Sequence, residues 1–184
     1  MMKGITKTIP IALLCAVSSG AFAATTPATD NTPQEAYDDI TRSLDDLHPI
    51  TFQAPAEKYK LLVFIDNQCV YCSEVVKNIK KYTDAGLTMS FLTVAPKSIR
   101  DSVIEDMGRV WCSADKTKSL QQAMAGFLPD NDTTPACSDL VTRQSALADR
   151  LGITVTPVMV VVEPETRSIV GSQPPAAILT ALKK

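Results

Sequence analysis

The stretch LLVFIDNQCVYCSEVVKNIKKY, residues 61–82, is the most informative part of this chain. Its beginning is rich in branched and aromatic residues and predicts a buried central strand over residues 60–66. Its remainder predicts a helix over residues 70–82, because apolar residues recur along one helical face. Cys69 and Cys72 stand three residues apart where the strand gives way to the helix. A packed core gains little from that arrangement, whereas a redox centre gains a great deal.

Cysteines in this position are suited to disulfide exchange. Cys69 lies near the N-terminus of the predicted helix, where free backbone N–H groups and the helix dipole stabilise an anion. Such placement lowers the pKa of a cysteine to about 3.5–7.5, and the thiolate is the nucleophile. We expect Cys69 to attack a substrate disulfide and the more buried Cys72 to resolve the mixed disulfide. The intervening Val70 and Tyr71 are predicted to contact the substrate.

Two other interpretations of this pair need to be weighed. A C-x-x-C pair is half of many zinc sites, and Cys112 and Cys137 would have to complete a four-thiolate set. Those two lie 25 residues apart, without the usual short spacing, and His48 is the only histidine, so we expect no metal and no cofactor. The second interpretation is a purely structural Cys69–Cys72 disulfide, but the short loop that it closes would contribute little stability.

The first 23 residues have the pattern of a cleaved signal peptide. Two lysines precede the apolar run IPIALLCAV, and A-F-A at residues 21–23 is a cleavage signal. The apolar run is too short to span a bilayer, and no later segment has the roughly 18 apolar residues of a transmembrane helix. We therefore expect an exported protein without stable membrane insertion, in a compartment that oxidises thiols.

The charge and length of the chain limit the classes of partner that it can have. Without the two lysines of the signal segment, the 18 basic residues fall to 16 against 20 acidic ones, a net charge of −4. No basic patch stands out, which argues against nucleic acid and anionic membranes as partners. The remaining 161 residues of the 184 suit one domain with a sizeable core.

Residues 24–48 are predicted to form a flexible leader and one short amphipathic helix. The leader over residues 24–32 is small, polar and rich in turn formers. Thr32 is a plausible N-cap, Pro33 suits the first helical position, and a helix of about 15 residues follows. Its apolar stripe consists of Ala36, Ile40, Leu44 and Leu47. Packing of this stripe against the domain is the simpler expectation, and self-association is the alternative.

Residues 49–184 are predicted to form the catalytic domain, an α/β thioredoxin-like fold. An extended segment at 50–55 and strands at 60–66 and 87–94 enclose the helix, which calls for a right-handed parallel crossover. A helical insertion occupies about 98–150, in pieces separated by CSADKT and FLPDNDTTPACS. The end of the chain is predicted as strands at 153–162 and 167–171, a turn between them, and a closing helix at 174–184. The order is βαβ, helical insertion, ββα.

Thr156-Pro157 interrupts the last long apolar run. A proline inside such a run argues against an ordinary central strand. It is explained if the Thr156–Pro157 bond is cis, which would give a tight bend beside the redox helix. The bend would leave the backbone of Thr156 available to pair with an extended substrate strand. An edge-strand proline is the alternative.

Cys112 and Cys137 bracket a loop with two prolines in the helical insertion. In an exported protein such a pair is most simply a structural disulfide, which for a loop of this size contributes around 3 kcal/mol. A second redox-active pair is the alternative.

Four motifs in this order resemble the catalytic domain of the periplasmic disulfide isomerases of the DsbC/DsbG type. They are CVYC after FID, VWCSADKTKSLQQAMAG, LGITVTP and GSQPP, and the resemblance covers roughly residues 49–182. It implies a thioredoxin fold with a helical insertion. It further implies Cys69 as nucleophile, Cys72 as resolving thiol, a cis bond at Thr156–Pro157 beside them, and a structural Cys112–Cys137 disulfide.

The sequence also departs from that family. Its members carry an N-terminal dimerisation domain, and here only residues 24–48 precede the catalytic part. Val70 replaces the glycine or proline usual between the cysteines, which can alter the redox potential. No histidine stands between them, unlike in the DsbA-type oxidases. Val63 occupies the place where thioredoxins hold a buried carboxylate, six residues before the nucleophile, and the isomerases resemble this chain in lacking it.

These features together predict an exported thiol:disulfide oxidoreductase that isomerises or reduces incorrect disulfides in secreted proteins. The resemblance implies the periplasm as the compartment, a membrane reductant of the DsbD type as partner, and unfolded or misoxidised proteins as substrates. One alternative is a net oxidase with DsbA-like activity, and another is a chaperone or binding module dedicated to a surface assembly. The oligomeric state is left open between a monomer and a dimer formed through the short helix.

Overall fold

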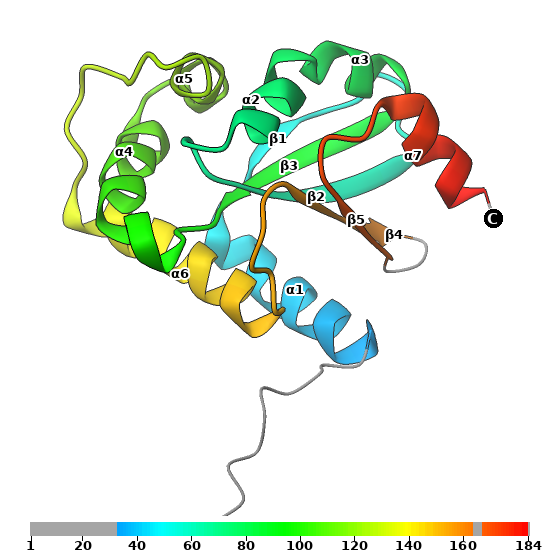
Figure 1. Ribbon diagram of the computed structural model, residues 1–184, viewed down its shortest axis with the longest axis horizontal. Coiled ribbons are helices and arrows are strands. Elements are labelled where there is room, and N and C mark those ends of the chain that lie inside the picture. The colour runs from blue at the N-terminus through cyan, green and yellow to red at the C-terminus, as the bar shows by residue number, and fades with distance from the viewer. Residues whose placement is uncertain (1–32, 164–166, 184) are drawn as a thin grey trace, which may run out of the picture.

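The computed structural model describes residues 33–163 and 167–183. The predicted signal peptide, the leader and most of the turn after the fourth strand lie outside these residues. The described part forms a five-stranded mixed sheet with helices on both faces (Figure 1).

The order of the strands in the sheet is β1-β3-β2-β4-β5. The central strand β2 pairs in parallel with β3 and antiparallel with β4. The predicted buried central strand and the parallel crossover are therefore confirmed. The strands are β1 (Ile50–Phe52), β2 (Tyr59–Ile65), β3 (Leu87–Thr93), β4 (Val158–Glu163) and β5 (Arg167–Val170).

The helices divide into an N-terminal one, a crossover pair, an insertion and a closing one. They are α1 (Pro33–Leu47), α2 (Val70–Lys77), α3 (Ile79–Asp84), the 3₁₀ turn η1 (Lys97–Ile99), α4 (Arg100–Cys112), α5 (Lys116–Ala123), α6 (Pro135–Arg150) and α7 (Pro175–Leu182). The insertion from η1 to α6 stands between β3 and β4, so the predicted thioredoxin-like fold class is confirmed. Within the described ranges, no helix has both the length and the apolar character needed to cross a membrane.

The side chains of β2 alternate between two apolar layers, as the period of a strand requires. Leu61, Val63 and Ile65 join a cluster with side chains of α2, α3, α4, α5 and α7. Leu62 and Phe64 join a second cluster with side chains of α1 and α6. In Figure 1, α2 and α3 lie on one side of the sheet and α1 and α6 on the other. Burial on both faces explains the unbroken apolar run in this strand.

The helix predicted over residues 70–82 is two helices in the structure. The break falls at Asn78, whose amide Nδ2 donates to the Glu74 carbonyl at 2.8 Å and whose backbone leaves the helical region at φ −96° and ψ 15°. A side chain that bonds to the carbonyl four residues earlier competes with the regular helical ladder. The second helix ends before Gly86, where φ of +93° requires a glycine.

Two other predicted boundaries are wrong. Helix α6 begins at Pro135, inside the segment expected to be a loop, because the Thr134 hydroxyl oxygen accepts from the Cys137 N–H and proline suits the first helical turn. Strand β4 begins only at Val158, because the chain bends at Pro157 before it enters the sheet.

Helix α1 packs on its own domain, in line with the simpler expectation. Ile40 and Leu47 are buried in the layer that α1 shares with α6. Asp39 forms ion pairs with Arg42 and, across to α6, with Arg150. The hydrogen bond from Arg42, with the Arg150 guanidinium also beside it, holds the pKa of Asp39 below its ordinary value.

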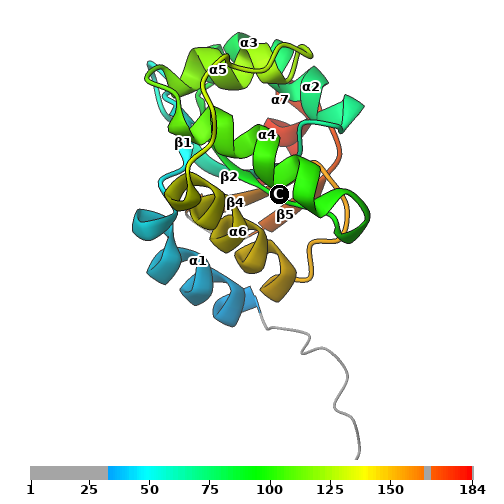
Figure 2. The ribbon, with the colours of Figure 1, turned by 90° about the vertical axis from the view of Figure 1, so that its left-hand side faces the viewer.

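Buried polar groups of α6 fasten the insertion to the sheet. The Gln144 side chain is fully buried, accepts from the Thr93 N–H at 2.9 Å and donates to the Leu47 carbonyl at 2.8 Å. The Ser145 hydroxyl oxygen accepts from the Ala95 N–H at 3.0 Å. The bonds to Thr93 and Ala95 satisfy backbone N–H groups at and just after the end of β3, and the bond to Leu47 satisfies a carbonyl at the end of α1. Figure 2 shows α6 running beside α1.

Candidate active site

The site is built on the first turn of α2. Cys69 is the N-cap residue, with extended backbone angles of φ −89° and ψ 113°. Its sulfur accepts the backbone N–H of Cys72 at 3.1 Å, which is the role that a serine or aspartate oxygen has at an ordinary N-cap. The Cys69 sulfur thus occupies the place where a helix N-terminus stabilises an anion.

Cys69 and Cys72 form a disulfide in this structure, with their Cα atoms 5.2 Å apart. Their exposure differs, since Cys72 is fully buried whereas Cys69 is partly exposed. An incoming substrate sulfur can therefore reach Cys69 and not Cys72. Val70 and Tyr71 between them are 69% and 61% exposed, which is high for side chains of this type.

The Thr156–Pro157 bond is cis, and the tertiary fold brings it beside the cysteines. The Cys69 sulfur lies 3.5 Å from the Thr156 carbonyl oxygen, although the two residues are 87 positions apart. Pro157 is buried, while Val155 is 54% exposed beside the site. Because β4 lies between β2 and β5, Pro157 leads into an interior strand and the edge-strand alternative is wrong.

Asp66 is a residue of this site that the sequence reasoning missed. It follows the last residue of β2 and is only 4% exposed. Its Oδ1 accepts from the Gln68 N–H at 2.9 Å and its Oδ2 accepts from the Thr156 hydroxyl at 2.7 Å. One carboxylate oxygen and the sulfurs of Cys69 and Cys72 all lie within 4.8 Å of one another. The signal in the sequence was an acidic residue directly after a buried strand and three residues before the first cysteine.

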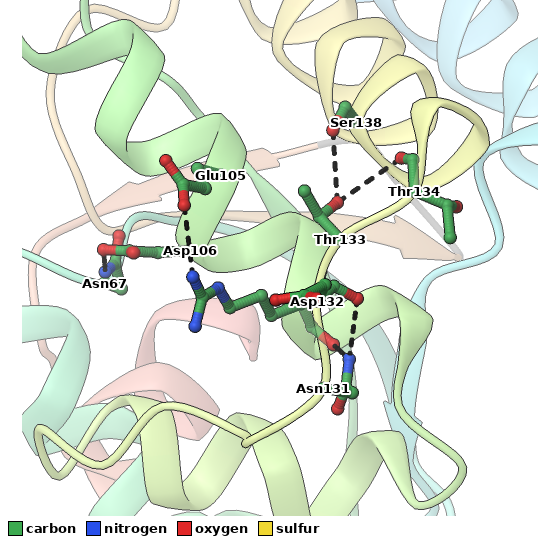
Figure 3. Close-up of polar contacts among 9 residues, drawn as sticks. Asn67, Glu105, Asp106, Asn131, Asp132, Thr133, Thr134 and Ser138 are labelled. Carbon is green, nitrogen blue, oxygen red and sulfur yellow. Dashed lines mark hydrogen bonds and ion pairs between the residues drawn. The ribbon is translucent and has the colours of Figure 1, made fainter.

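The loop that carries these residues is anchored to the helical insertion. Asn67 donates to Asp106 of α4 at 2.8 Å, and Gln68 donates to Ser102 at 2.8 Å. Figure 3 shows Asn67 and Asp106 facing each other across the gap between the loop and α4. The position of Cys69 therefore depends on α4 as well as on α2.

Among the described residues, Cys69 bonds to Cys72 and Cys112 bonds to Cys137, so these four sulfurs do not form a four-thiolate zinc set in this state. Within the described residues, the group of potential metal ligands that converge is Asp66, Cys69 and Cys72. Its two sulfurs are bonded to each other and do not serve as thiolate ligands while that bond exists.

The second disulfide joins Cys112, the last residue of α4, to Cys137 in the first turn of α6. The Cα atoms are 5.8 Å apart, and the Thr134 hydroxyl lies 3.2 Å from the Cys112 sulfur. At the same junction, Thr133 approaches α4 and bonds to Ser138, as Figure 3 shows. The pair fastens the two long helices of the insertion to each other.

A hollow of about 450 Å³ borders the site between α2 and α5. It begins at Val70 and is lined farther along by Glu74, Lys77, Gln121 and Met124. It gives a polypeptide bound at Cys69 a mixed polar and apolar surface on this side.

The sequence matches the thioredoxin-like domain family over residues 48–184. The chain belongs to that family. Among curated proteins it is 33% identical to the thiol:disulfide interchange protein DsbC of Salmonella typhimurium over 112 residues, which are 60% of this chain and 46% of that protein. It is 30% identical to the protein of the same name from Escherichia coli over 127 residues, 68% of this chain and 51% of the relative. The chain thus spans about half the length of these curated relatives.

Solved structures support the thioredoxin-like fold. A disulfide interchange protein from Neisseria gonorrhoeae matches with a TM-score of 0.60 and 22% identity, covering 73% of this chain and 93% of that one. The catalytic domain of Proteus mirabilis ScsC matches with a TM-score of 0.56 and 18% identity, covering 80% and 96%. At these identities the likeness concerns the fold alone.

Proposed function

We propose that this chain is a thiol:disulfide oxidoreductase that isomerises or reduces incorrect disulfides in exported proteins. The observation that carries the proposal is the placement of Cys69. Its sulfur caps α2 by accepting the Cys72 N–H, is partly exposed, and lies 3.5 Å from the Thr156 carbonyl oxygen. When the pair is reduced, this position favours the Cys69 thiolate, the form that attacks a disulfide. Cys72, buried behind it, resolves the mixed disulfide.

The substrates in this proposal are unfolded or misoxidised polypeptides. Val70, Tyr71 and Val155 place apolar surface around the exposed side of Cys69. An extended segment can pair with the backbone of Thr156, next to Pro157, while its own side chains contact that surface. Folded proteins rarely offer a disulfide on such a segment, so the surface selects chains that have not folded correctly.

The proposed compartment is the periplasm, reached through cleavage of the signal peptide at residues 1–23. The matched relatives are thiol:disulfide interchange proteins, which supports a reductant of the DsbD type as partner. Such a donor is needed because isomerisation begins with reduced Cys69. Ile40 and Leu47 of α1 are used in the chain's own core, so we expect a monomer, which sedimentation tests.

Trapping of covalent intermediates tests the proposal. Cys72→Ala leaves Cys69 without its resolving partner, so mixed disulfides with substrates and with the reductant should accumulate. They are isolated from periplasmic extracts under acid quench, separated without reductant and identified by mass spectrometry. The matched control is Cys69→Ser/Cys72→Ala, which should trap nothing.

The outcomes separate the candidate functions. Equal capture by both variants would contradict the catalytic assignment and favour a chaperone or binding module. Capture of a membrane oxidant, together with a reduction potential near about −120 mV, would favour a net oxidase. Potentials lower by some tens of millivolts, with capture of a reductant, fit isomerisation or reduction.

A further inference from the structure

The resolving cysteine presents a problem of proton transfer. Cys72 is fully buried, so its thiol has no direct contact with bulk water. It must lose its proton before it attacks the Cys69 sulfur, because the thiolate is the nucleophile. A free thiol has a pKa near 8.5, and apolar surroundings raise it. The N–H group at the start of α2 does not help Cys72, because it bonds to the Cys69 sulfur.

Asp66 is positioned to remove that proton. Its carboxylate is buried, and one of its oxygens lies within 4.8 Å of both sulfurs. The Gln68 N–H and the Thr156 hydroxyl each donate to it, so both bonds hold it as an acceptor. That separation allows transfer directly after a small movement, or through one bridging water.

We propose that Asp66 accepts the Cys72 proton when Cys72 resolves a mixed disulfide, an inference that rests on the function proposed above. The Cys72 S–H bond breaks and its proton moves to an Asp66 oxygen. The Cys72 thiolate bonds to the Cys69 sulfur while the bond from Cys69 to the substrate sulfur breaks, and that sulfur leaves with the electron pair. The cysteine pair is oxidised and the substrate disulfide is reduced. Asp66 then passes its proton to the leaving thiolate.

In the reverse direction the same carboxyl group returns the proton. A substrate thiol gives its proton to Asp66 and attacks the Cys69 sulfur as a thiolate. The Cys69–Cys72 bond breaks, and Cys72 departs as a thiolate that takes this proton from Asp66. Asp66 thereby provides what Val63 cannot, since Val63 lies buried in the middle of β2 with an apolar side chain. The carboxylate comes from the end of the strand instead.

The other titratable groups nearby either form hydrogen bonds with other residues or are exposed to solvent. Asp106 of α4 accepts from Asn67 at 2.8 Å. Tyr82 of α3 donates its hydroxyl to the Gln173 carbonyl at 2.9 Å, and Glu74 of α2 is exposed. The lysines of α5 are also exposed. Among the residues that the structure describes, Asp66 is the carboxylate that converges on the sulfur pair.

Stopped-flow reaction with the aromatic disulfide DTNB separates the two chemical steps. Attack by reduced Cys69 releases one coloured thionitrobenzoate, at a rate proportional to reagent concentration. Closure by Cys72 releases the second, at a rate independent of that concentration. Asp66→Asn should slow closure at pH 7 on the order of 100-fold, while attack stays within about twofold. The deficit should shrink toward pH 9, where hydroxide removes the thiol proton.

Asp101→Asn is the matched control, because it makes the same change in an exposed acid at the start of α4 and should leave both phases unaltered. Closure that is unchanged in Asp66→Asn, or equally slow at every pH, would overturn the proposal. If Asp66→Asn does not fold, the wild-type protein decides. A wild-type closure rate that rises about tenfold per pH unit between pH 6 and 8, as closure driven by hydroxide does, would overturn the proposal, and a shallower rise would support it. The proposed function is overturned instead if wild-type Cys69 attacks DTNB no faster than free cysteine does. Excess DTNB would still allow the rate of closure to be measured in that case.

Discussion

The two cysteine pairs of this chain share more geometry than their spacing suggests. Cys72 and Cys137 occupy the same position in the first turn of a helix, three residues after the N-cap. In α6 the N–H of Cys137 donates to the Thr134 hydroxyl oxygen, and the sulfur of Cys137 is bonded to Cys112 at the end of α4. In α2 the corresponding N–H goes to the sulfur of Cys69 itself.

The difference between the pairs lies in the surroundings of the sulfur atoms. Around Cys69 the fold gathers the Thr156 carbonyl, the buried Asp66 carboxylate and exposed apolar side chains. Cys112 instead lies where α4 meets α6, with the Thr134 hydroxyl close by. A cysteine at a helix start is therefore one condition for exchange chemistry, and the groups contributed by other elements supply the rest.

The largest expected effect is loss of turnover from the first pair alone. Cys69→Ser should reduce the rate of insulin disulfide reduction to background, because no other thiol among the described residues is both accessible and placed at an N-cap. Cys112→Ala/Cys137→Ala should keep at least about half of the wild-type rate, since that pair joins α4 to α6 and its sulfurs are not bonded to the first pair. Turnover that depends equally on both pairs would contradict the different roles assigned to them.

The second expected effect concerns stability, to which the Cys112–Cys137 pair should contribute more than the Cys69–Cys72 pair. Cys112→Ala/Cys137→Ala opens a loop of 25 residues and should cost about 3 kcal/mol. The Tm should fall by about 6–12 °C for a chain of this size, as calorimetry would show. Reduction of Cys69–Cys72 alone should change the Tm much less. An equal loss of stability from the first pair would contradict its assignment as the working pair.

The junction that holds the second pair should be sensitive to small changes of volume. A Cβ atom at Gly108 of α4 would collide with the Thr133 hydroxyl. Gly108→Ala should therefore cost about 2 kcal/mol in chemical denaturation, without altering the rate of Cys69 alkylation. Adding Thr133→Ala should restore part of the stability, because it removes the colliding oxygen. If the double variant is no more stable than the single one, the steric explanation is wrong.

The helix-start geometry of the first pair can be transplanted onto the second. Cys112→Ser/Thr134→Cys would create a C-x-x-C sequence at residues 134–137, with a sulfur in place of the oxygen that caps α6. The thiol at position 134 should react with iodoacetamide about tenfold faster at neutral pH than a free cysteine, because the helix start favours its anion.

In a Cys69→Ser background this transplanted pair should still fail to reduce insulin. No counterpart of the buried carboxylate or the cis-proline loop stands beside Thr134 among the residues that the structure describes. Turnover by the transplant would show that the helix position suffices and that the surrounding groups are dispensable for exchange.

Local pattern was a good guide wherever neighbouring residues determine the outcome. The apolar run of β2 and the crossover to β3 followed from residue types and spacing, and so did the position of Cys69 at a helix start. The break at Asn78 was missed because a single side chain competes with the helical ladder there, and periodicity does not register it. The Gln144 bonds were missed because a polar residue on a helix gives no sign of being buried.

The sequence by itself located the cysteine pair at a helix start and the order of strands and helices around it, because strand and helix periods and the cap at Cys69 are local properties. The family resemblance placed Thr156–Pro157 beside the cysteines, but only the tertiary structure showed that the buried Asp66 carboxylate joins them. Thr156 and Asp66 are 90 positions apart, and they meet because β4 pairs antiparallel with β2 and brings the bend before Pro157 to the end of β2. Such pairings depend on the global packing of the sheet, which spacing along the chain does not encode.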